Sequence, residues 1–277
     1  MKPEDLKLIV KEKYSEIALQ SKEQNESSCC GATGCCSTVD YSIFSESYGH
    51  LSGYLPDADL GLGCGLPTEF AMIKPGDTVI DLGSGAGNDC FVARSLAGEN
   101  GQIIGIDMTE AMIEKAKENA AKLGFTNVSF RLGDIESMPL TANKADVVIS
   151  NCVLNLVPDK RKAFSEIYRV LKPGGHLSVS DVVVKGQLPT EIREAAELYA
   201  GCVSGAIEMD EYLGIMVSAC LTNIKVQKEK QVKVPDEILS DYLDAQALDA
   251  FKKSGTGIYS ITVYAEKPTQ DCQCQHC

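Results

Sequence analysis

Short apolar runs alternate with amphipathic stretches through the middle of the chain, from Thr78 to Val184. An uninterrupted apolar run of four to eight residues is typical of a buried strand, and apolar residues recurring every three or four positions are typical of a helix. Strands that alternate with helices form a mostly parallel sheet covered on both faces. The pattern predicts a doubly wound α/β fold with strands at 79–82, 102–106, 128–131, 146–150 and 177–184, and helices at 89–96, 109–123 and 160–171.

The segments that flank this block follow other patterns. Residues 4–20 predict an amphipathic helix, with Pro3 near its first turn. Beyond Gly186, two helical patterns at 190–200 and 209–219 precede strand-like runs at 224–232 and 259–265, which predicts a small α+β cap. We therefore expect four parts: an N-terminal helix with a cysteine-rich loop (1–70), the doubly wound domain (71–186), a C-terminal cap domain (187–267) and a disordered polar tail (268–277).

The charge and composition narrow the classes of partner and compartment. The formal net charge is −13 and no basic cluster offsets it, which argues against nucleic acid as a partner. The N-terminus lacks an apolar signal-peptide core, and no apolar run approaches the roughly 18 residues of a membrane span. We therefore expect a cytoplasmic protein without membrane association. In that reducing compartment, the 12 cysteines favour metal-binding, catalytic or buried thiols over a disulfide scaffold.

A glycine-rich turn follows the first predicted strand and precedes a helix. The turn contains Gly83, Gly85 and Gly87, and glycines there let the backbone approach a ligand while the helix start offers free N–H groups. The next strand ends at Asp107, about 20 residues further on, where an acid can accept both hydroxyls of a ribose. Dinucleotide-binding proteins share this general layout.

Four further features make the pattern more specific. Asp81 lies two residues before the first glycine, Gly133-Asp134-Ile135-Glu136 follows the third strand, Asp146 to Asn151 forms the fourth, and Leu171-Lys172-Pro173-Gly174-Gly175 precedes the fifth. In this order the set resembles the class I S-adenosylmethionine-dependent methyltransferases, which have a Rossmann-like fold, over about residues 75–184. The resemblance implies that Asp81 to Gly87 hold the methionine end of the cofactor, Asp107 the ribose, and Met108, Asp134 and Ile135 the adenine. The expected cofactor residues are Asp81, Gly83, Ser84, Gly85, Gly87, Asp107, Met108, Asp134, Ile135 and Asn151.

Three cysteines, Cys64, Cys152 and Cys202, lie in predicted loops of three distant segments. Their spacing fits no zinc ribbon or finger, so we hypothesise one site assembled by the fold. Soft thiolates select thiophilic centres, and three of them suit trivalent arsenic. Arsenic keeps a lone pair that attacks a sulfonium methyl directly, whereas amine, phenol or carbon acceptors usually require help with a proton. Of the three histidines, we expect only His50 near the site.

Four segments resemble the arsenite methyltransferases, and the likeness extends to about residue 267. They are Val10-Lys11-Glu12-Lys13-Tyr14, Gly-Leu-Gly-Cys-Gly around Cys64, Asn-Cys-Val-Leu-Asn-Leu around Cys152 and Ala-Gly-Cys-Val-Ser-Gly-Ala around Cys202. The resemblance implies that Cys152 and Cys202 bind arsenic, with Cys64 as their partner. A fourth thiol would lie in the 29–36 cluster, where Cys36 or Cys35 fits best. The resemblance also implies repeated rounds, with a site disulfide that exchanges through Cys36 and is reduced by thioredoxin or glutathione.

Two other functions remain open at this point. One is a carbon methyltransferase acting on a quinone- or sterol-like molecule, and the other is a soft-metalloid-sequestering protein that retains a cofactor domain. Not every thiol needs a function, because free cysteine is a common small buried residue. We expect simple burial for Cys90 and Cys220, which lie inside helical patterns, and a variable chain end for Cys272, Cys274 and Cys277.

Overall fold

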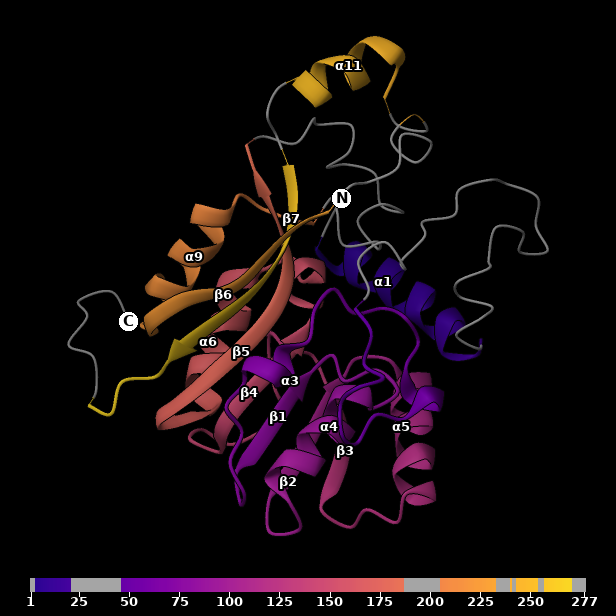
Figure 1. Cartoon of the computed structure of the whole chain (residues 1–277), viewed down its shortest axis with the longest axis vertical. Helices are drawn as coiled ribbons and strands as arrows, with labels where there is room; N and C mark the ends of the chain where they lie inside the picture. Colours follow the sequence, from indigo (N-terminus) through magenta and orange to yellow (C-terminus); the bar gives the residue numbers. More distant parts are fainter. Residues whose placement is uncertain are drawn as a thin grey trace.

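The computed structural model describes residues 3–20, 46–186, 205–232, 240, 243–253 and 257–270. Seven strands form one sheet in the order β3-β2-β1-β4-β5-β7-β6 (Figure 1). The first five strands run parallel, and β7 pairs antiparallel with both β5 and β6. The strands are β1 (Thr78–Leu82), β2 (Gln102–Asp107), β3 (Val128–Leu132), β4 (Ala145–Asn151), β5 (Leu171–Lys185), β6 (Thr222–Val232) and β7 (Gly257–Glu266).

Helices cover the sheet on both faces because its strands are apolar on both faces. Val79 packs with Phe91 of α4 in one buried cluster, whereas its neighbour Ile80 packs with Phe164 of α6 and Tyr212 of α9 in another. The result is a three-layer α/β/α arrangement. The helices are α1 (Pro3–Ala18), η2 (Pro56–Ala58), α3 (Pro67–Phe70), α4 (Asn88–Ala97), α5 (Glu110–Lys122), η3 (Leu154–Leu156), α6 (Lys160–Val170), α9 (Met209–Ser218) and α11 (Ala245–Lys253).

The doubly wound fold predicted from the sequence is confirmed. Every strand and helix predicted between residues 79 and 184 is present, with ends that shift by a few residues. The largest shift is at β5, which begins at Leu171 instead of 177 because Leu171 pairs with Ala145 at the start of β4. The predicted helix at 190–200 lies outside the described residues, as does most of the expected tail.

The two C-terminal strands differ from the prediction. They do not form a sheet of their own within a cap: β7 pairs with β5 along its length, with Val179 opposite Val263, and β6 pairs with β7. Without β7, the buried strand β5 would present an unpaired edge of N–H and C=O groups. The local sequence pattern identifies these segments as strands but carries no information about which edge they join.

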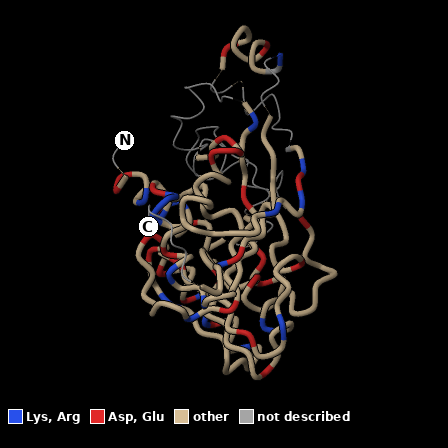
Figure 2. Tube along the Cα trace, turned by 90° about the vertical axis from the view of Figure 1, so that its left-hand side faces the viewer, with Lys and Arg blue, Asp and Glu red and all other residues tan. Residues whose placement is uncertain are grey.

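Charged side chains of both signs are interspersed along the described chain (Figure 2). None of the helices that the structure describes is long and apolar enough to span a membrane.

The winding of the sheet changes direction at β1. The chain leaves β1 toward β2 and β3 on one side and later returns to build β4 and β5 on the other. In open α/β sheets, ligands bind in the crevice outside the carboxyl ends of the strands at such a switch point. The glycine-rich turn after β1 and the Asn151-Cys152 pair at the end of β4 lie at this edge.

Candidate functional site

A pocket opens at the carboxyl ends of β1, β2 and β4, and α1 contributes to its wall. All but one of the predicted cofactor residues line it. The exception is Gly87, which begins α4 with a φ of 98°, and a Cβ there would lie 2.8 Å from the Phe91 ring. The predicted residues that line the pocket are Asp81, Gly83, Ser84, Gly85, Asp107, Met108, Asp134, Ile135 and Asn151.

Asp107 is fixed at the end of β2 by two backbone groups. Its Oδ2 accepts the N–H of Gly85 at 3.0 Å, and its Oδ1 accepts the N–H of Thr109 at 2.9 Å. Burial raises the pKa of the Asp107 carboxyl, and these N–H donors act in the opposite direction. The acid predicted to hold a ribose is therefore tied directly to the glycine-rich turn.

Several buried oxygens of the pocket residues have no hydrogen-bond partner among the residues that the structure describes. They are Ser84 Oγ, Asn88 Oδ1 and Asp89 Oδ1. Buried polar atoms are normally paired, and an unpaired one costs about 1–3 kcal/mol. A ligand with polar hydrogens, such as the amino-acid part of S-adenosylmethionine, would satisfy these acceptors. The residues present therefore fit the cofactor that the sequence predicts.

Two buried acids give the pocket a preference for positive charge. Burial and the charge of Asp89 raise the pKa of Asp81 well above its usual range, and burial raises the pKa of Asp89 to about 6. A bound cation would favour the ionised form of both groups. Cys90 is fully buried behind them and donates its thiol hydrogen to Asp81 Oδ2 at 3.2 Å. Burial raises the pKa of the Cys90 thiol, which is consistent with the structural role expected for it.

The helix α1 covers the part of the pocket next to β3. Lys7 donates to Asp134 Oδ2 and to Glu136 Oε2, each at 2.6 Å, and Val10 and Tyr14 also line the pocket. The sequence identifies α1 only as an amphipathic helix and gives it no place at the cofactor. The regular spacing of Val10 and Tyr14 along one face was the available signal, but it does not say what that face covers.

Two of the predicted arsenic thiols are brought together. Cys152 lines the pocket just after β4, and Cys64 packs with it in one buried cluster that also contains Val10 and Leu156. Both cysteines are buried and free of disulfide bonds. The pKa of the buried Tyr212 hydroxyl is raised by burial, then by Asp181, and further by the charges of Cys64 and Cys152.

Comparison with known proteins identifies the family. A methyltransferase-domain model matches residues 73–231. The chain is 39% identical to the arsenite methyltransferase of Halobacterium salinarum, over 97% of this chain and 68% of that protein. The chain belongs to the arsenite methyltransferase family. It is also 33% identical to the arsenite methyltransferase of Aquipseudomonas alcaligenes, over 83% of this chain and 66% of the relative, so it spans about two thirds of the length of these two proteins.

A solved structure of a family member has the same fold. The crystal structure of an arsenic(III) S-adenosylmethionine methyltransferase from Chlamydomonas reinhardtii superimposes with a TM-score of 0.65 at 35% sequence identity. The match covers 76% of this chain and 69% of the algal one. S-adenosylmethionine is accordingly the cofactor of this family member.

The remaining cysteines of this arsenite methyltransferase family member divide into two groups. Cys220 is buried just after α9 as expected, but it is disulfide-bonded and so is more than a packing residue. The predicted third arsenic ligand Cys202 and the predicted exchange thiol Cys36 lie outside the described residues. The same is true of Cys29, Cys30, Cys35, Cys272, Cys274 and Cys277.

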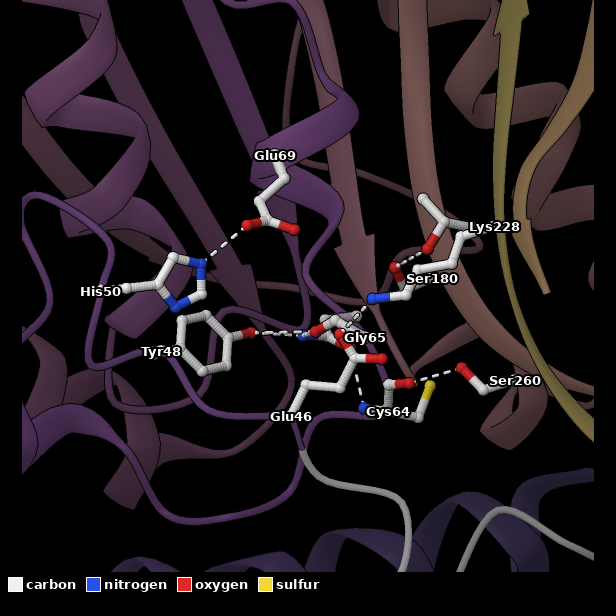
Figure 3. Close-up of polar contacts among 11 residues, drawn as sticks. Glu46, Tyr48, His50, Cys64, Gly65, Glu69, Ser180, Lys228 and Ser260 are labelled. Atoms are coloured by element: carbon white, nitrogen blue, oxygen red, sulfur yellow. Dashed lines mark hydrogen bonds and ion pairs between the residues drawn. The ribbon is translucent and has the colours of Figure 1, made fainter. Parts of the chain in front are cut away.

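His50, the histidine expected near the site, is not among the residues that line the cofactor pocket. His50 is exposed and its Nε2 pairs with Glu69 Oε1 at 2.7 Å (Figure 3). His176 instead contacts the carbonyl of Ala71 through its Nε2, at 2.6 Å. Among the residues that the structure describes, no histidine lines the pocket.

The sequence did not identify two residues at the centre of the site, Tyr48 and Asp89. The Tyr48 hydroxyl donates to Asp89 Oδ2 at 2.9 Å and accepts a hydrogen bond from Asn151 Nδ2 at 2.5 Å. Asn151 in turn contacts the backbone of the Cys64 loop, defined here as Gly63 to Gly65. These contacts join residues from separate segments, and neither a motif nor a periodicity marks them.

Proposed function

We propose that this protein transfers the methyl group of S-adenosylmethionine to trivalent arsenic bound by the thiolates of Cys64, Cys152 and Cys202. The observation that carries the proposal is the position of Cys152, which lines the cofactor pocket and shares a buried cluster with Cys64. Thiolates are ligands for soft, thiophilic centres. A thiol at the wall of a methyl-donor pocket, with a second thiol in the same buried cluster, therefore suits a metalloid acceptor better than an amine or a phenol.

The pocket residues bind and orient the two reactants. S-adenosylmethionine supplies an electrophilic methyl group on a sulfonium. Asp107 would hold its ribose, Asp134 and Ile135 its adenine, and Asp81 and Asp89 would favour its positive charge by Coulomb attraction. The thiolates would hold arsenic at the same pocket. Fixing two reactants in this way can contribute on the order of 7–11 kcal/mol toward the barrier.

The chemistry requires thiols but no general base. As arsenous acid binds, each thiol forms an As–S bond, and the displaced hydroxide leaves with the thiol proton as water. In the transfer, the arsenic lone pair forms the As–C bond while the C–S bond of the sulfonium breaks, so arsenic loses two electrons formally and a neutral thioether leaves. The absence of histidine from the described pocket wall is compatible with this reaction, because no proton has to be removed from the acceptor.

A further round requires that arsenic be reduced again. Two site thiols would supply the two electrons by forming a disulfide, and Cys36 would pass this disulfide to thioredoxin or glutathione. Both reductants belong to the cytoplasm, where we place the enzyme. The acidic net charge of −13 fits a small thiol-bound substrate and no nucleic-acid partner.

The test is to incubate the full chain with arsenite, S-adenosylmethionine and a thiol reductant, and then to separate the arsenic species. We expect methylated arsenic from the wild type and from Cys277→Ser, a control at the last residue. Cys152→Ser and Cys64→Ser should lose at least about 90% of the product, since serine is a poor ligand for a soft centre. No methylated arsenic above a protein-free control, or full turnover by Cys152→Ser, would contradict the proposal.

A further inference from the structure

The side chain of Asn151 forms hydrogen bonds to the backbone on both sides of the Cys64 side chain. Its Oδ1 accepts the backbone N–H of Cys64 at 3.0 Å, and its Nδ2 donates to the carbonyl of Gly65 at 2.8 Å. Because Asn151 immediately precedes Cys152 in the chain, one residue contacts the backbone on both sides of one predicted arsenic ligand and is bonded directly to the other. Asn151 is thus placed to set the position of Cys64 relative to Cys152.

Close packing leaves the Cys64 loop little freedom to move relative to Asn151. A Cβ added to Gly63 would lie 2.6 Å from Asn151 Nδ2, and one added to Gly65 would lie 2.6 Å from Ser180 Oγ. Both distances are shorter than real Cβ contacts, so glycine is required at each position. The Ser260 hydroxyl also donates to the carbonyl of Cys64 (Figure 3). A shift of the Asn151 amide would therefore move Cys64.

Tyr48 connects Asn151 and the Cys64 loop to the cofactor pocket. It is buried, and its single hydroxyl hydrogen is committed to Asp89 Oδ2 at 2.9 Å, since the carbonyl of Gly65 is further away at 3.4 Å. The Tyr48 oxygen accepts the second hydrogen of Asn151 Nδ2. The shorter hydrogen bonds run from Asn151 through Tyr48 to the Asp89 carboxylate, and Asn151 Nδ2 also reaches Asp89 Oδ2 directly at the longer distance of 3.2 Å.

Asp89 completes the connection at the pocket. Its Oδ2 receives the Tyr48 hydroxyl, whereas its buried Oδ1 has no hydrogen-bond partner in the described part of the chain. Asp89 lines the pocket, so a cationic group of the cofactor can pair with this carboxylate. Such a pairing would hold Asp89 ionised and fixed, and an ionised carboxylate accepts the Tyr48 hydrogen more strongly than a neutral carboxyl group does.

We propose that Tyr48 is a positioning residue that couples the cofactor pocket to Cys64, so that cofactor binding and arsenite binding strengthen each other. The first ligand orders the chain Asp89–Tyr48–Asn151, and the second ligand then meets thiols that are already placed. The coupling is reciprocal by thermodynamic necessity. This inference rests on the proposed function, because it assumes that arsenite binds to Cys64 and Cys152.

The test measures binding and not turnover. Arsenite affinity is determined calorimetrically on the reduced full chain, with and without S-adenosylhomocysteine, which has no transferable methyl. In the wild type, S-adenosylhomocysteine should tighten arsenite binding by about fivefold or more, within the usual range of coupling between sites. In Tyr48→Phe the factor should fall below about twofold. Tyr264→Phe is the matched control, because it removes another tyrosine-to-carboxylate bond, to Glu266, away from the pocket.

A second readout identifies the thiols involved. Protection of Cys64 and Cys152 from alkylation, measured by mass spectrometry at a fixed arsenite concentration, should increase with S-adenosylhomocysteine in the wild type and in Tyr264→Phe only. If Tyr48→Phe does not fold, as judged by its thermal melt, Asn151→Ala replaces it and should lose the coupling as well. Failure of the wild type to bind arsenite would refute the proposed function. Two results would refute the coupling through Tyr48 but leave the proposed function standing. The wild type could bind both ligands without either affecting the affinity for the other, or the folded variant could show the same coupling as the wild type.

Discussion

The backbone N–H of Cys152 donates to the carbonyl of Ser180 at 2.8 Å, while Cys152 itself has a φ of 59°. This is the left-handed region, which glycine adopts easily and other residues adopt at a cost of about 1–3 kcal/mol. The chain therefore keeps a thiol at a position where glycine would fit the backbone better. A ligand role for Cys152 accounts for this choice, and burial alone does not.

The strain at Cys152 leads to a stability prediction. Between two variants that both lack the thiol, Cys152→Gly should have a higher free energy of unfolding than Cys152→Ala by about 1 kcal/mol, because alanine keeps the left-handed cost. The measurement is urea denaturation of both proteins. The same pair at Cys64, where φ is not positive, is the control and should give the reverse order. If the glycine and alanine variants have the same order of unfolding free energy at both positions, the backbone at Cys152 is not strained as proposed.

Cofactor affinity should depend on pH through Asp89. Burial raises the pKa of Asp89 to about 6, although Asn151 and Tyr48 donate to its carboxylate. A cationic ligand binds the ionised form and lowers this pKa in the complex. The affinity for S-adenosylmethionine should therefore be highest above pH 6 and decrease as the pH falls through 6, approaching about tenfold per pH unit. The raised pKa of Asp81 acts in the same direction.

Titration calorimetry between pH 5 and pH 8 tests this dependence. Asp89→Asn cannot ionise, so it should bind S-adenosylmethionine more weakly at pH 8 and show a shallower pH profile. Glu69→Gln is the control, because Glu69 is an acid that pairs with His50 outside the pocket. Identical profiles for the wild type and Asp89→Asn would show that another group controls binding.

The sequence predicted those parts of the site that depend on local order along the chain. Asp107 ends a strand at the expected distance from the glycine turn, and Cys152 ends the strand beside β1, so a parallel sheet places both at one edge. Contacts between loops could not be predicted in this way. Tyr48 meets Asn151 across 103 residues, and only the folded chain brings the two together. That His50 does not line the pocket was not predictable either, since position along the chain does not determine which way a loop side chain points.

The position of β6 and β7 was also beyond local reasoning. The alternation of apolar residues identifies each strand, but the pairing of β7 with β5 depends on which edge of the sheet is left open. The fold between residues 79 and 184 was predictable because each crossover between neighbouring parallel strands is short and right-handed in nearly all proteins.

Lys7 should control how firmly α1 covers the cofactor. Its ammonium pairs with Asp134 and with the buried Glu136, each at 2.6 Å. Lys7→Met would leave Glu136 with only the N–H of Asp159, without its charged partner, and loosen the helix over the pocket. We expect S-adenosylhomocysteine to bind about fivefold or more weakly to Lys7→Met, in line with the roughly 1–3 kcal/mol cost of an unpaired buried polar group. Lys11→Met is the matched control, because Lys11 lies on the same helix and pairs with the exposed Glu110, and such surface pairs contribute about 0–1 kcal/mol. The affinity of both variants for S-adenosylhomocysteine is measured by calorimetry. Equal affinities would mean that α1 does not hold the cofactor through Lys7.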